Sequence, residues 1–222
     1  MPRRIFLALL CASGLLVGAA RAQIIVGNSI VSRGIRDTAQ TVFVMSSQGF
    51  GAGAIGSSVA TWSYYSLFNG SSLTPVLFER TGVNHDYIVR AIGASVTTSL
   101  GAHLDLPFNL ATGSLAITNG NFFFGWKDGT ASTDKAASIA FDYNAGTPKV
   151  VYFAANGPAG FAVSNSYNFD GHELGRTYSI SASTIPEPSV TAALVAVAAL
   201  GCAVWRRRTK RGGASDPSPG TR

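Results

Sequence analysis

Short runs in which apolar and polar residues alternate fill the middle of the chain, and this pattern predicts β-strands. Residues 61–66 and 138–143 alternate with a period of two, which places one face of a strand in a core and the other in water. Pairs such as Asn69-Gly70 and Asp128-Gly129 separate the runs and favour tight turns. We therefore expect strands at residues 24–26, 41–46, 58–68, 75–80, 86–92, 95–100, 102–110, 114–118, 122–126, 137–142, 149–154, 160–163 and 177–183.

The number and spacing of these runs predict the fold class. Many short strands with turn residues every eight to twelve positions are typical of two packed sheets. No helical repeat is sustained between residues 23 and 184, and a stretch of this length can bury roughly two-thirds of its unfolded surface. We therefore expect an all-β protein with a single β-sandwich or jelly-roll-like domain at residues 23–184.

The N-terminal residues 1–22 have the pattern of a secretory signal peptide. Arg3 and Arg4 precede an apolar run, and Ala20-Arg21-Ala22 forms a cleavage site of the A-x-A type. The pattern predicts that signal peptidase cuts before Gln23 and that the middle of the chain is exported.

The C-terminal end has three parts in order. They are the tripeptide Pro186-Glu187-Pro188, the apolar residues 189–205, and a basic cluster at 206–211 that begins with Arg206, Arg207 and Arg208. A helix of 17 residues rises about 25 Å, close to the roughly 30 Å of a bilayer core. The arginines mark the cytoplasmic side, and the prolines keep the backbone at Glu187 extended. A polar tail, residues 212–222, follows.

This arrangement resembles the PEP-CTERM sorting signal over residues 185–211. The resemblance implies a precursor anchored in the inner membrane of a Gram-negative bacterium that makes extracellular polymeric substance. It also implies that an exosortase cuts near the tripeptide, after which the protein enters the cell envelope or extracellular matrix. The alternative is a plain C-terminal anchor, which has the same apolar run and basic residues.

The charge of the whole chain is a poor guide to the exported domain. The chain has a formal net charge of +6, with 17 basic and 11 acidic residues. The terminal segments hold nine of the basic and two of the acidic residues, which leaves residues 23–185 with a net charge of −1. Such a domain does not attract nucleic acid by electrostatics, so nucleic acid is not an expected partner. Both cysteines, Cys11 and Cys202, also lie in the terminal segments.

Catalytic groups and metal ligands are sparse in the predicted domain. His85, His103 and His172 lack the spacing of zinc ligands. Only two glutamates are present, and no nucleophile motif accompanies them, so we expect a protein that is not an enzyme and needs no cofactor. Oxygen-rich turns leave calcium as an alternative, with Asp128, Asp142, Asn144 and Asp170 as candidate ligands, although such residues are also ordinary turn formers.

Aromatic residues are numerous in the predicted domain, and they have two interpretations. Alternating aromatic residues fill the interior of a sandwich, whereas exposed rings beside Asn and Asp can hold sugar rings. Neighbouring aromatic residues on a regular strand must point to opposite faces, so some of them should be exposed. The sequence therefore predicts a structural or polysaccharide-associated protein. The alternative is a lectin-like module that binds carbohydrate, with Trp62, Tyr65 and Trp126 as the first candidates.

Overall fold

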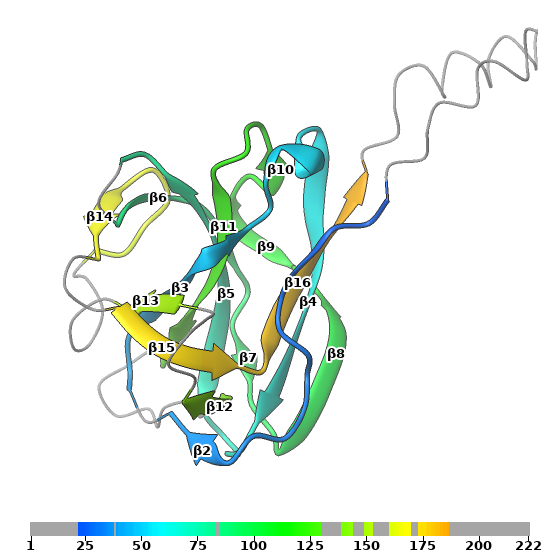
Figure 1. The fold of residues 1–222 in the computed structure, drawn as a ribbon, viewed down its shortest axis with the longest axis vertical. Coiled ribbons are helices and arrows are strands. Elements are labelled where there is room, and N and C mark those ends of the chain that lie inside the picture. The colour runs from blue at the N-terminus through cyan, green and yellow to red at the C-terminus, as the bar shows by residue number, and fades with distance from the viewer. Residues whose placement is uncertain are drawn as a thin grey trace, which may run out of the picture. The chain divides into compact units, whose positions relative to one another are not determined.

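The computed structural model describes residues 22–37, 39–82, 85–129, 139–143, 149–152, 160–169 and 173–186. These residues belong to one compact unit, residues 22–186. In this part of the chain the structure has sixteen strands and no α-helix; a single 3₁₀ turn, η1 (Ala52–Ala54), precedes β4. All of the strand pairing is antiparallel, so the prediction of an all-β, sandwich-like fold is confirmed (Figure 1).

The first sheet is built around two long strands and contains both ends of the described unit. Its order is β1 (Ile25–Gly27), β16 (Ile180–Pro186), β4 (Ser57–Ser66), with β10 (Ala116–Ile117) and β8 (Gly101–Pro107) both paired to β4. β16 therefore lies between the first strand of the domain and its longest strand.

The second sheet has eleven strands. Nine follow one another in the order β14 (Ser166–Asn168), β6 (Asp86–Gly93), β5 (Ser72–Arg80), β11 (Phe122–Asp128), β3 (Val42–Gly49), β13 (Lys149–Tyr152), β15 (Glu173–Tyr178), β12 (Ala140–Tyr143) and β2 (Ile35–Arg36). The short strands β7 (Val96–Thr97) and β9 (Leu110–Gly113) pair with β5 and β6. Antiparallel pairing of β5, β11 and β3 forms the middle of this sheet.

A bend at Ser179 joins the two sheets, because β15 continues directly into β16 (Figure 1). The Ser179 N–H donates to the Ala140 carbonyl oxygen at 2.8 Å. The Ser179 carbonyl oxygen accepts a hydrogen bond from the Tyr65 N–H at 2.9 Å. One residue therefore bonds to β12 of the second sheet and to β4 of the first. This bend fixes the corner at which the two sheets meet.

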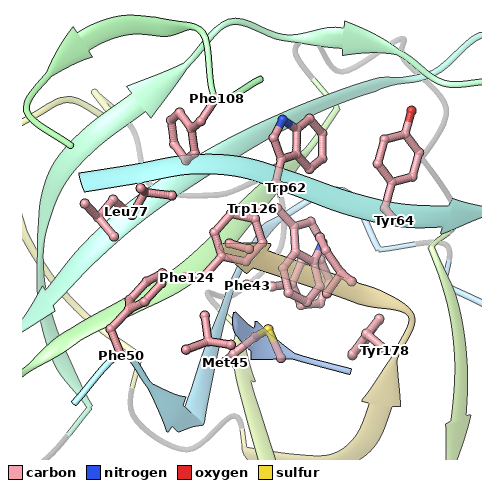
Figure 2. Packing of buried hydrophobic residues seen from close by; sticks show 14 of the residues in the cluster. Phe43, Met45, Phe50, Trp62, Tyr64, Leu77, Phe108, Phe124, Trp126 and Tyr178 are labelled. Carbon is pink, nitrogen blue, oxygen red and sulfur yellow. The ribbon is translucent and has the colours of Figure 1, made fainter. Parts of the chain in front are cut away.

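The main core lies where the two sheets pack together, and aromatic rings dominate it (Figure 2). Phe43 and Trp126 stack with their ring centroids 4.9 Å apart, and the ring of Tyr178 lies edge-on to Trp126 at 5.0 Å. All three side chains are essentially inaccessible to water. Burial of such large rings gives much of the hydrophobic stabilisation of a domain that has no cysteine.

A second core covers the opposite face of the second sheet. Along β3, Phe43 and Met45 belong to the main core, whereas Val42 and Val44 belong to the second. Successive side chains of a strand point to opposite faces, so the two clusters lie on opposite sides of the sheet. The second cluster is covered by residues 160–169, which supply Phe161, Val163, Tyr167 and Phe169.

Most of the predicted strands are present, and the exceptions are short. The run predicted at 160–163 is wrong, because these residues form turns that cover the second core, and the nearby strand is β14. The run predicted at 102–110 divides into β8 and β9, and the run at 177–183 is divided by the bend at Ser179. The strand β2 lies between the predicted runs 24–26 and 41–46, where we predicted no strand.

Candidate functional site

The two ends of the described unit lie side by side. β1 pairs with β16 so that Ile25 is opposite Ser183. Beyond that pair, the Ile24 N–H donates to the Thr184 hydroxyl at 3.2 Å, and the Thr184 N–H donates to the Ile24 carbonyl at 2.9 Å. The chain therefore enters and leaves the fold at the same end, on neighbouring strands (Figure 1).

Both predicted processing sites border this end. Ala22 and Gln23 are exposed and immediately precede the residues that pair with β16. Pro186 is the last residue of β16 and is opposite Ser57 of β4. A proline, which has no N–H to donate, suits the end of a strand. The predicted residues Ala20, Glu187, Pro188, Arg206, Arg207 and Arg208 lie outside the described residues, as does the predicted helix at 189–205.

The pairing of β16 weakens as it approaches the predicted sorting motif. A register shift between Ser183 and Thr184 disturbs its ladder with β4. Ile185 and Pro186 pair only with Ser58 and Ser57 of β4, because the pairing with the β1 side ends at Ile24. Strand ends with few partners open more readily than strand centres. The last two residues of β16 are therefore the least constrained part of that strand.

Two of the candidate sugar-binding residues lie in the core. Trp62 is 1% exposed and Trp126 is 0% exposed, so neither ring has a face that a sugar could reach. The expectation that they form a carbohydrate platform is therefore corrected: both belong to the main core shown in Figure 2. Tyr65 is partly exposed on β4. The structure does not bring these three side chains together on one surface, since only Tyr65 reaches the surface.

Trp62 is the first ring of a stack that runs along the buried face of β4 and onto β8. Its centroid lies 5.1 Å from that of Tyr64, which in turn lies 4.6 Å from the imidazole of His103. Burial raises the pKa of Tyr64 to about 12, because the phenolate would lose its hydration. The His103 ring also contacts the Ser99 carbonyl at 2.9 Å. These contacts explain the position of His103 without a metal.

The candidate calcium ligands are divided between different environments. Asp142 accepts a hydrogen bond from Arg33 at 2.9 Å and another from the Gly34 N–H at 3.2 Å. These hydrogen bonds, that of Arg33 first, hold the pKa of the Asp142 carboxyl below its usual 3.8. Asp128 is buried at the end of β11, and Asn144 and Asp170 lie outside the described residues. An arginine therefore already occupies the position that a cation would take beside Asp142.

A buried ionic cluster fastens residue 37 to β15, and it has no counterpart in the sequence patterns above. Asp37 is 4% exposed and accepts a hydrogen bond from Arg176 at 3.0 Å and another from the Tyr178 hydroxyl. The pKa of Tyr178 is raised well above its ordinary 10. Burial is the larger cause, and the negative charge of the nearby Asp37 is the second. The partners are separated by 139 and 141 positions, so no local motif could have identified them.

Arg176 also packs against Tyr143, an exposed aromatic residue that was not among the predicted sugar-binding candidates. The Arg176 guanidinium lies 4.5 Å from the centroid of the Phe141 ring and 5.5 Å from that of Tyr143. The two rings meet edge-on with centroids 5.3 Å apart, and Tyr143 is 68% exposed. Tyr143 is therefore an exposed ring that packs on Phe141 and Arg176. Exposure is the property that we expected of Trp62, Tyr65 and Trp126.

Comparisons with protein families, curated proteins and solved structures found no match to this chain. Within the described ranges, no helix has the length and apolar character needed to cross a bilayer. In the same part of the chain, no three His, Cys, Asp or Glu side chains gather into a group that could hold a metal ion.

Proposed function

We propose that this chain is the precursor of an exported, non-enzymatic protein of the cell envelope or extracellular matrix, with a jelly-roll-like domain. In this proposal signal peptidase cuts before Gln23, residues 189–205 anchor the precursor in the inner membrane, and an exosortase cuts near the Pro186-Glu187-Pro188 motif. The observation that carries the proposal is the pairing of β1 with β16, which brings the two predicted processing sites to one end of the domain.

This arrangement suits two successive cleavages. The compact unit, residues 22–186, ends within one or two residues of both predicted sites. Cleavage at either site therefore removes no strand from the fold and leaves the packing of the core unchanged. Large extracellular polysaccharides are the expected surroundings of the released domain, and its near-neutral charge is compatible with a structural role beside them.

Replacing Pro186, Glu187 and Pro188 together with alanine is expected to abolish C-terminal processing. The product should then begin at Gln23, extend through Arg222 and remain in the inner-membrane fraction, because the recognised motif is lost while the apolar segment is kept. Intact mass of the protein recovered from each cell fraction measures this directly. Pro107→Ala, at an exposed proline in β8, is the matched control and should be processed normally. Release of the triple-alanine variant at the normal rate would contradict the proposal.

A second candidate function, carbohydrate binding, is favoured by the exposed ring of Tyr143. We expect Tyr143→Ala to weaken binding of acidic and neutral oligosaccharides at least about tenfold, equivalent to 1.4 kcal/mol. Its melting temperature should change little, because the ring is 68% exposed. Calorimetric titration measures the affinity, with Leu104→Ala as the control for an exposed apolar residue elsewhere. Equal affinities of wild type and Tyr143→Ala would exclude a sugar site at this ring.

A further inference from the structure

The end of the domain at which the chain enters and leaves is apolar and exposed. Ile25 is 66% exposed, Ile185 is 56% exposed and Ile55 is 38% exposed. Ile25 is opposite Ser183, and Ile185 lies two residues further along β16, so the two side chains occupy diagonal positions on neighbouring strands. These three isoleucines are among eight large apolar side chains that are exposed in the described residues.

Contacts between four segments place Ile55 at this same end. Pro186 is opposite Ser57, two residues after Ile55, and the Gly56 N–H donates to the Ile117 carbonyl at 2.9 Å. A Cβ on Gly53 would lie 3.3 Å from the Ile24 side chain. We call these four segments, residues 23–25, 51–58, 115–120 and 184–186, the uncharged tip, because none of their side chains is ionisable.

One ion pair lies beside the tip in the described residues, and Glu187 follows Pro186 directly in the sequence. Glu79 and Arg90 make an ion pair at 2.5 Å, and the Asn119 amide, which belongs to the tip, donates to Glu79 at 2.6 Å. The carboxylate is therefore already neutralised by a cation. The exposed isoleucines of the tip gain from contact with apolar matter, and its exposed polar side chains, such as Gln23 and Thr118, carry no charge.

We propose that the uncharged tip lies on the bilayer in the membrane-anchored precursor, with its three isoleucines in the lipid interface. The inference rests on the proposed function, in which residues 189–205 span the membrane. Only Glu187 and Pro188 separate Pro186 from Ser189, and three residue steps span at most about 10 Å. The tether therefore keeps Pro186 within about 10 Å of Ser189, where the predicted membrane segment begins, and interfacial segments bury their apolar faces to a depth of about 5–10 Å.

A bilayer fits this surface better than a second copy of the chain does. A stable protein interface buries about 800 Å² on each partner, more than three partly exposed isoleucine side chains supply. The side chains of the tip carry no charge, and signal cleavage before Gln23 adds one α-amino group to it. Its contact with the membrane should therefore form on zwitterionic vesicles and depend only weakly on salt.

The test places one fluorescent label at a time on the precursor that remains after signal cleavage, residues 23–222, reconstituted into phosphatidylcholine vesicles. With Cys202 replaced by serine, Ile25→Cys and Ile55→Cys report on the tip, and Leu100→Cys is the matched control. Leu100 is 62% exposed and adjoins Gly101, which is opposite Ser66 at the far end of β4. Nine residue steps along a strand separate Ser66 from Ser57, a distance of about 30 Å. Nitroxide lipids, labelled at the headgroup, quench fluorophores that lie at the membrane surface.

We expect several-fold stronger quenching at positions 25 and 55 than at position 100, already present on pure phosphatidylcholine and changed little when phosphatidylglycerol or salt is added. Equal quenching at all three positions, in protein that floats with the vesicles on a density gradient, would overturn the tip contact and leave the anchor intact. Protein that does not float with the vesicles would overturn the anchor and the tip contact together. Quenching that needs phosphatidylglycerol would replace the apolar contact with an electrostatic one and would also overturn the proposal.

Discussion

Replacing Arg176 with methionine is expected to destabilise the domain by about 3 kcal/mol, because the change leaves the buried carboxylate of Asp37 without its cation. Methionine keeps an unbranched apolar stem over the Phe141 ring, so the loss reports mainly on the charge. The Tyr178 hydroxyl and the Ala39 N–H still donate to Asp37 in this variant. The expected loss is therefore at the lower end of the roughly 3–5 kcal/mol that removing one partner of a buried ion pair costs. The melting temperature should fall by roughly 10 °C.

Chemical denaturation of the compact unit, residues 22–186, measures this loss, and the chain offers a matched control. Arg33 also pairs with a carboxylate, at 2.9 Å, but the side chain of its partner Asp142 is 49% exposed, against 4% for Asp37. Arg33 also donates to the Ser179 hydroxyl at 2.7 Å, so Arg33→Met should cost about 1–2 kcal/mol, less than Arg176→Met. Adding Asp37→Asn to Arg176→Met should recover part of the loss, because the uncompensated charge is removed. Equal losses in Arg176→Met and Arg33→Met would contradict a special role for the buried cluster.

The positions of the strands were predictable because alternation and turn residues are local properties. β6, for example, alternates between partly exposed and buried side chains along its whole length, as a period of two requires. The partners of the strands were not predictable in the same way. β16 pairs with β1, about 155 positions earlier in the chain, and no pattern within either strand encodes this choice. The candidate site depends on that pairing, so its location could be recognised only in three dimensions.

The second core explains the largest difference between pattern and structure. A strand with a period of two was expected to place one face in a core and the other in water. In β3 and β5, however, both faces are buried, because residues 160–169 cover the outer side of the second sheet. A continuous apolar run such as 42–45 is the local sign of burial on both faces. What covers that face cannot be read from the run itself.

The same reasoning explains why two of the three aromatic candidates, Trp62 and Trp126, are buried. On a regular strand two successive rings point to opposite faces, but a sequence does not say which face has a covering layer. In β11, Phe123 packs against the second core and Phe124 against the first, so both neighbours are in apolar surroundings. The ring that does reach the surface, Tyr143, ends the short strand β12 and is supported by an arginine from β15.

Trp126→Ala is expected to cost about 3–5 kcal/mol of folding stability, enough to unfold a domain of ordinary stability at least in part. The indole packs against Phe43 and Tyr178 in the main core, and no water reaches it. Any sugar binding lost in this variant would therefore report on unfolding and not on a missing contact. Circular dichroism and denaturation midpoints, measured beside the binding assay, separate these two causes.

Trp126→Phe is the control that makes this prediction specific. Phenylalanine keeps a ring in the stack with Phe43 and removes an indole N–H that has no hydrogen-bond acceptor among the described residues. Removing an unsatisfied buried donor offsets part of the lost packing, so this variant should lose less than half of what Trp126→Ala loses. Tyr65→Ala, at a partly exposed ring on β4, should stay within about 1 kcal/mol of the wild type. A Trp126→Ala protein that keeps its full stability would show that the ring lies at the surface, and the assignment of this residue to the core would then be wrong.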